Sequence, residues 1–99
     1  MKLYLDDIRH PHQSGYQDSE WIVCKNDKTF SDMFTSFDNI MTHISFDYDL
    51  NCVKWLCDYI LDNGLDISNL TLNFHTVDVV GKESMETYWR NFQNYYVSI

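Results

Sequence analysis

The sequence predicts a small α/β domain built on a mostly parallel sheet of four or five strands. Short apolar runs typical of strands alternate with longer segments whose apolar residues recur every three or four positions. Strands that are separated by helices pair in parallel, because the intervening helix carries the chain back across the sheet. No repeat or low-complexity tract divides the 99 residues, so we expect a single domain over residues 1–99.

Four apolar runs predict the strands. Residues 2–5 end in an acidic pair, and residues 21–24 form the second run. Residues 44–46 lead into an Asp-Tyr-Asp sequence, and residues 70–74 alternate between apolar and polar side chains. Residues 97–99 could add a short fifth strand or form a tail.

Three amphipathic segments predict the helices, at residues 28–38, 51–63 and 83–95. Asp27 is the expected N-cap of the first helix, and Gly64 closes the second. Residues 10–20 hold the only proline and are expected to form a loop.

The charge and the cysteines limit the classes of function. Fifteen acidic residues against seven basic residues give a net charge of −8, which disfavours nonspecific binding to nucleic acid. This charge could serve solubility alone or a metal site. No apolar run is long enough to span a membrane and no signal peptide is evident, so we expect a cytoplasmic protein, in the host cytoplasm if it is viral. Cys24, Cys52 and Cys57 match no zinc motif and are expected to be buried free thiols.

Polar side chains follow three of the four predicted strands. In a parallel sheet the carboxyl ends of the strands meet at one edge, where ligands bind in open α/β folds. Carboxylates gathered there repel one another, and Mg²⁺ or Mn²⁺ would relieve the repulsion and recruit phosphate oxygens. A cap or turn is the alternative role for the first acidic pair. The candidates are Asp6 and Asp7 after the first strand, Asp47 and Asp49 after the third, and His75 and Thr76 after the fourth.

Each of the other polar candidates has two interpretations. His75 could be a general acid or base, or a buried, hydrogen-bonded imidazole. Thr76 could donate its hydroxyl to a phosphoryl group or stabilise a turn, and Arg9 could clamp a phosphate or form a surface ion pair. Gly81 and Lys82 precede the predicted last helix, whose first amides could hold an anion.

Together these motifs resemble the cyclic-phosphate processing receiver-like family, compact relatives of the response-regulator receiver domain. The resemblance covers the chain from Leu3 to about Met85. It is carried by Pro11 and by the segments Leu3–Arg9, Trp21–Val23, Ile44–Leu50, Phe74–Thr76 and Val80–Met85.

The resemblance implies a flavodoxin-like, three-layer receiver-like domain with an acidic metal pocket that acts on cyclic or nucleotide-derived phosphates. It implies that Asp6, Asp7 and Asp47 are the metal-binding acids, that Asp49 is the second acid of the Asp-x-Asp step, and that His75 is the family histidine. The chain departs from the family at four places. A receiver lysine on a fifth strand is not evident. A tyrosine, Tyr48, replaces the histidine between the two acids, the glycine-containing loop after them is missing, and the segment after His75 lacks the usual Asn and Pro.

Three hypotheses for the function follow. In the first, Asp6, Asp7 and Asp47 hold Mg²⁺ or Mn²⁺, His75 and Asp47 carry the hydrolysis of a cyclic phosphate, and the substrate is contacted by Arg9, Asp49, Thr76 and Lys82. In the second, the chain is a catalytically inactive receiver-like regulatory module that senses a phosphorylated small molecule. In the third, its acidic face binds a protein partner or a second copy of the chain.

Overall fold

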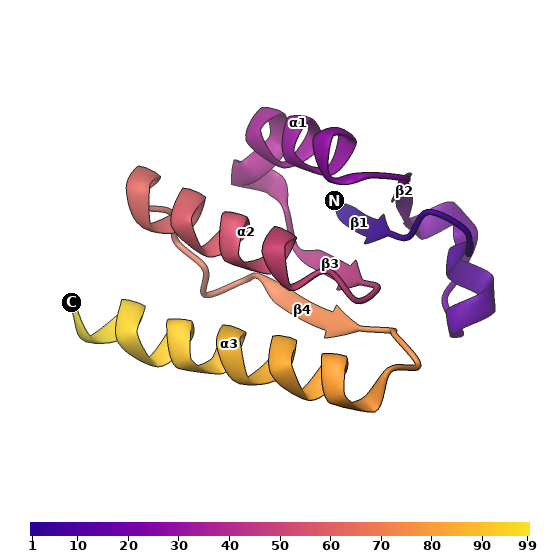
Figure 1. The fold of residues 1–99 in the computed structure, drawn as a ribbon. Helices are drawn as coiled ribbons and strands as arrows, with labels where there is room; N and C mark the ends of the chain where they lie inside the picture. The colour runs from indigo at the N-terminus through magenta and orange to yellow at the C-terminus, as the bar shows by residue number, and fades with distance from the viewer.

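A four-stranded, all-parallel sheet forms the centre of the structure, a computed structural model that describes residues 1–99. The strand order across the sheet is β2-β1-β3-β4 (Figure 1). The fold confirms the expected α/β class and is consistent with a flavodoxin-like receiver domain. The strands are β1 (Lys2–Leu5), β2 (Ile22–Cys24), β3 (His43–Phe46) and β4 (Thr71–Phe74), each within one residue of its predicted start and end.

The sequence pattern predicts the three helices, but it locates the residues that cap them only approximately. They are α1 (Asp27–Phe37), α2 (Leu50–Asn63) and α3 (Val79–Ser98). Asn26 and not Asp27 caps α1, because the Asn26 side chain accepts the Thr29 N–H at 2.8 Å. Gly64 closes α2 in the left-handed conformation, as predicted. None of the helices combines the length and apolar character that crossing a membrane requires.

Two predictions about the ends of α3 were wrong. Asp78 accepts the Gly81 N–H at 3.0 Å and starts the helix at Val79, so Gly81 and Lys82 lie inside its first turn and do not precede it. The helix then runs to Ser98, so residues 97–98 form no fifth strand. Similarly, the expected loop at 10–20 contains two short 3₁₀ helices, Pro11–Ser14 and Asp18–Glu20.

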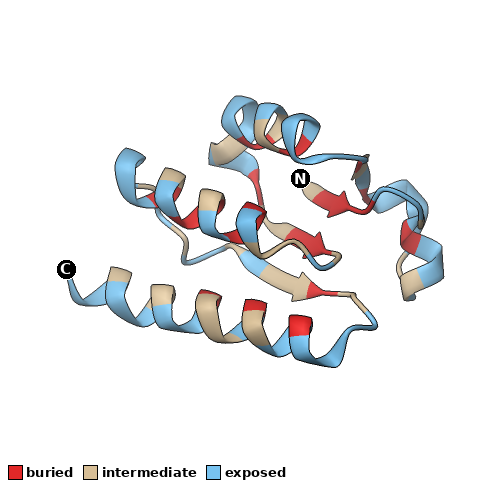
Figure 2. Ribbon diagram, viewed as in Figure 1, coloured by how far each residue is buried: buried red, intermediate tan, exposed pale blue.

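The core lies between the sheet and the three helices. Leu3, Ile44 and Phe46 point from the strands into this core, where Phe30 of α1 packs against Phe46 and Met85 projects from α3. Figure 2 shows the buried segments of the helices turned toward the sheet. α3 also packs against α2 and runs alongside β4 (Figure 1).

The opposite face of the sheet is covered by the 3₁₀ segment rather than by a helix. Tyr4 points to this side from β1 and makes edge contacts with Tyr16 and Trp21, with ring centroids 6.3 and 6.4 Å apart. Its hydroxyl lies 2.8 Å from the Ser14 hydroxyl. The sheet is therefore the middle layer between the helices and this aromatic segment.

The topology determines where a ligand-binding crevice can form. β1 pairs with β2 on one side and β3 on the other, with Leu5 opposite both Cys24 and Phe46. The chain leaving β1 goes toward β2, whereas the chain leaving β3 goes through α2 toward β4. Because these connections diverge, a crevice opens at the carboxyl ends of β1 and β3.

Candidate functional site

An acidic cleft of about 630 Å³ lies at this switch point. Five carboxylates line it, together with the exposed lysines Lys25 and Lys28 and the ring of Tyr48. The carboxylates belong to Asp6, Asp7, Asp27, Asp47 and Asp49. Four of these acids are sequence-predicted site residues, and the fifth, Asp27, had been assigned only a capping role.

The strand ladders bring the predicted acids and the histidine to one edge. The Asp47 N–H donates to the Leu5 carbonyl at 3.0 Å, and the His75 N–H donates to the Phe46 carbonyl at 2.9 Å. The Asp6 N–H donates to the Cys24 carbonyl at 3.1 Å. Each of these residues thus continues the parallel pairing by one step beyond its strand, which holds Asp6, Asp47 and His75 side by side.

Arg9 bridges two of the acids. Its Nε donates to Asp6 Oδ2 at 2.9 Å, and its Nη2 donates to Asp47 Oδ1 at 3.0 Å. The repulsion expected between these two carboxylates is therefore already offset by a guanidinium from the same chain. The Arg9 Nη1 makes no hydrogen bond within the protein, so this end of the guanidinium remains available to a ligand.

Each oxygen of the Asp6 carboxylate accepts two hydrogen bonds from the protein. Oδ1 accepts the backbone N–H groups of Ile8 and Arg9, and Oδ2 accepts the Arg9 guanidinium and the His75 ring. Burial alone would raise the Asp6 pKa, but the backbone and His75 hydrogen bonds and the charge of Arg9 together hold it below its ordinary value. Asp6 is therefore an ionised anchor for the site.

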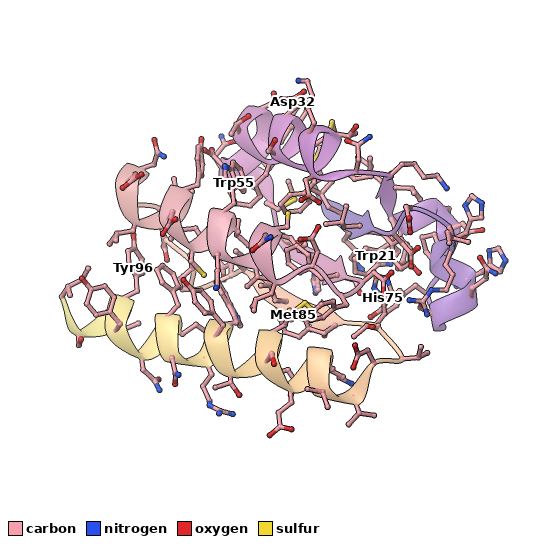
Figure 3. The ribbon with its side chains drawn as sticks, viewed as in Figure 1. Trp21, Asp32, Trp55, His75, Met85 and Tyr96 are labelled. Atoms are coloured by element: carbon pink, nitrogen blue, oxygen red, sulfur yellow. The ribbon has the colours of Figure 1, made fainter.

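His75 is enclosed, with a side chain only 3% exposed, and Figure 3 shows it inside the molecule. Its ring stacks on Tyr4 with centroids 4.2 Å apart. Because the Asp6 carboxylate can only accept, Nε2 carries the proton and donates over 3.1 Å, and Nδ1 accepts from the Ser45 hydroxyl at 2.8 Å. The Ser45 oxygen in turn lies 3.3 Å from the Tyr16 hydroxyl. Burial lowers the pKa of His75, against the opposing effect of Asp6, and keeps the ring neutral.

Asp27 and Asp49 form a second, coupled pair in the cleft. Asp49 caps α2, since its Oδ1 accepts the Cys52 N–H at 3.0 Å. The Asp27 carboxyl is hydrogen-bonded to Asp49, and this bond, with burial and the Asp49 charge, raises the Asp27 pKa to about 6. Two ionised carboxylates at this separation repel each other, so below about pH 6 the pair retains one proton. The sequence signal for Asp27 was its position after the second strand, but its partner is 22 positions away.

Comparison with known proteins places this geometry in a family. The model for the cyclic-phosphate processing receiver domain matches residues 1–91 of the 99-residue chain. The chain belongs to this family. No curated protein and no solved structure matches it.

In this receiver domain, three of the four predicted phosphate-binding residues do not line the cleft: Arg9, which is hydrogen-bonded to two of the lining acids, and Thr76 and Lys82, which lie elsewhere. Thr76 accepts the Asp78 N–H with its hydroxyl oxygen at 3.1 Å, which is a turn contact before α3. Lys82 lies 3.9 Å from Glu86 on the surface of α3, beside a different groove. Both side chains are thereby occupied in local contacts in this structure.

Some of the side-chain atoms at this site that could bind a divalent cation are already hydrogen-bonded to the protein, and others are free. Asp6, Asp47 and His75 each have a ligand atom within 4.8 Å of the others, but the protein already uses those of Asp6 and His75. Asp47 Oδ2 and both oxygens of the exposed Asp7 accept no hydrogen bond. Free carboxylate oxygens are ligands of the type that Mg²⁺ and Mn²⁺ prefer.

Proposed function

We propose that the acidic cleft binds a cyclic or nucleotide-derived phosphate together with a Mg²⁺ or Mn²⁺ ion. One observation carries this proposal: five carboxylates and only two lysines line a single cleft at the switch point of a receiver domain. A phosphate would be repelled from such a cleft unless a cation came with it. The membership of the chain in a cyclic-phosphate processing family supports the choice of ligand.

Asp7 and Asp47 are the residues that would hold the ion, because both line the cleft and both have carboxylate oxygens that accept no hydrogen bond from the protein. When bound, the ion would neutralise charge and polarise a phosphoryl oxygen. In this proposal Asp6 positions Arg9, whereas its predicted role as a metal ligand stays a prediction. It accepts the Arg9 Nε and fixes the guanidinium at the site.

Arg9 would contact the phosphate from beside the cleft, because it does not line the cleft but is hydrogen-bonded to Asp6 and Asp47, which do. Its Nη1 is free of protein partners, and its other edge is held by Asp6 and Asp47. A guanidinium held in this way loses little conformational entropy when it binds an anion. Lys25, directly after β2, and Lys28 line the cleft and supply its own positive charges.

Hydrolysis would need a group that exchanges a proton near neutral pH. His75 is buried with both ring nitrogens engaged, whereas Asp27 lines the cleft with a pKa of about 6. Asp27 is therefore the better candidate for a general acid or base in a hydrolytic version of the proposal. The enclosure of His75 equally favours a second candidate function, in which the domain binds the phosphate without turning it over.

Calorimetric titration with a nucleoside cyclic monophosphate, with and without Mg²⁺, tests the binding step. We expect binding that requires the ion and that Asp47→Asn weakens at least tenfold. Asp62→Asn is the matched control, because Asp62 is an exposed acid near the far end of α2. Binding of equal strength without Mg²⁺, or no binding under either condition, would contradict the proposal for this ligand class.

Phosphorus NMR of the same mixtures separates the two candidate functions. Conversion of the cyclic phosphate to a monoester, reduced in Asp27→Asn, would support the hydrolase. A bound but unchanged cyclic phosphate would support the binding module.

A further inference from the structure

A second group of potential metal ligands lies next to the cleft, where α1 and α2 begin. One carboxylate oxygen of Asp27, one of Asp49 and the Sγ of Cys52 all lie within 4.8 Å of one another. Asp27 is the first residue of α1, Asp49 caps α2, and Cys52 is in the first turn of α2. The packing of α1 against α2 thus gathers three side chains that are far apart in the sequence.

Cys52 distinguishes this group from an ordinary cluster of surface acids. It is only 2% exposed, and its sulfur takes part in no hydrogen bond. A buried thiol usually lies among apolar side chains, as a small hydrophobic residue. Cys52 also belongs to the apolar core, but its sulfur lies within 4.8 Å of one oxygen each of Asp27 and Asp49 and has no hydrogen-bond partner.

A metal ion can reach these atoms from solvent. A groove of about 380 Å³ runs over the seam between the two helices, and Asp27, Cys52 and Trp55 line it. Asp32 stands at its α1 side, and Figure 3 labels both Asp32 and Trp55. Asp27 and Lys28 line both this groove and the acidic cleft, so the two hollows adjoin at the start of α1.

We propose that Asp27, Asp49 and Cys52 form a binding site for a thiophilic divalent cation of the Zn²⁺ class, with solvent completing the coordination. Sulfur and carboxylate oxygens together suit Zn²⁺, Co²⁺ or Cd²⁺ better than Mg²⁺, which prefers oxygen alone. Binding forms a metal–sulfur bond and breaks the S–H bond, and the thiol proton passes to water, as does any proton held between the two carboxyls. The charges also match: three anionic ligands balance a 2+ ion and the partial positive charges, about half a unit each, at the two helix starts.

Titration of the full chain with Co²⁺, under conditions that keep the thiols reduced, tests this site. We expect a near-ultraviolet absorption from sulfur-to-cobalt charge transfer that saturates at one ion per chain. Cys52→Ser should abolish this absorption. Cys57→Ser should retain it, because Cys57 is equally buried on the same helix but belongs to no cluster of ligand atoms.

Asp27→Asn provides a test that does not disturb the core, because Asp27 is exposed. It should weaken Co²⁺ binding at least tenfold, while Asp32→Asn, at the rim of the groove, should change it little. No absorption in the unmodified chain, or absorption that survives Cys52→Ser, would overturn the proposal. Equal affinities of Asp27→Asn and the unmodified chain would do so as well.

This inference stands apart from the proposed function. Asp47→Asn should remove Mg²⁺-dependent phosphate binding and leave the Co²⁺ absorption intact, because Asp47 is not among the three ligands. Cys52→Ser should show the opposite pattern. Either proposal can therefore fail while the other holds.

Discussion

The ring of Tyr48 lies directly against the α-carbon of Gly81. A β-carbon added to Gly81 would fall 2.2 Å from Tyr48 Cδ2, which is well inside contact distance. Tyr48 lines the acidic cleft after β3, and Gly81 is in the first turn of α3. Gly81 has no positive φ, so it is the close approach of the ring, not backbone conformation, that calls for glycine here.

Gly81→Ala should therefore lower the free energy of unfolding by about 1–3 kcal/mol, because the Tyr48 ring has to move. In a Tyr48→Ala background the same change should raise it by about 0.5–1 kcal/mol, since alanine is the better helix former. Urea unfolding of the four proteins measures the coupling. Equal effects of Gly81→Ala in the two backgrounds would show that the ring makes no such contact.

Arg9→Gln should lower the free energy of unfolding by about 3 kcal/mol, because it leaves the buried Asp6 carboxylate without its charged partner. Lys28→Gln is the matched control. It removes an exposed ion pair with Asp32 and should cost less than about 0.5 kcal/mol. Chemical denaturation of both variants at neutral pH provides the comparison, and similar small effects would mean that Arg9 is only a surface residue.

Asp6 should make the domain sensitive to acid. Its pKa in the folded state is lowered from 3.8, so the stabilisation is fully present above pH 3.8 and is lost as pH falls through the lower folded value. In Asp6→Asn this part of the acid dependence should disappear, and the variant should be less stable than the unmodified chain at neutral pH. Unfolding curves recorded on the acid side of pH 5 test this, and parallel profiles for the two proteins would contradict it.

Asp27 should affect the pH dependence of stability in the opposite direction to Asp6, because its contribution to the free energy of unfolding falls as pH rises. Its folded pKa is raised to about 6, so its contribution is fully present below pH 3.8 and is lost as pH rises through 6. The stability of Asp27→Asn relative to the unmodified chain should therefore increase between pH 4 and pH 7, by less than about 1 kcal/mol because solvent screens the exposed carboxyl. Asp32→Asn, on the same helix, should show no such trend. Thermal melts in a metal-free buffer series measure the difference.

Ser45→Ala should lower the free energy of unfolding by about 1–3 kcal/mol, because it removes the hydroxyl that satisfies the buried Nδ1 of His75. Ser19→Ala, at an exposed position, should have almost no effect. Nitrogen NMR of the His75 ring should find the proton on Nε2 in the unmodified chain. A proton on Nδ1 would contradict the hydrogen-bond chain from Ser45 to Asp6.

The regular elements of this domain are determined largely by local pattern. The apolar run at residues 2–5 and the three-to-four spacing along residues 51–63 predict β1 and α2 to within one residue, because each element must bury one side against the core. Acids and a histidine at the strand ends also located the candidate site, since parallel strands finish at a common edge. The ends of α3 were less predictable, because helix starts depend on which of several neighbouring polar side chains adopts the cap conformation.

The tertiary structure alone decided what the polar residues do. The sequence by itself determined that Asp6, Asp47 and His75 follow strands and that Arg9 lies nearby. Only the strand order brings the Arg9 guanidinium between the carboxylates of Asp6 and Asp47. It also stacks the His75 ring on Tyr4 and brings its Nδ1 to the Ser45 hydroxyl. The pairing of Asp27 with Asp49, and of both with Cys52, likewise required the packing of α1 on α2. The physical reason is that burial follows a local periodicity, whereas charge and hydrogen-bond partners are chosen by proximity in space between residues distant in the chain.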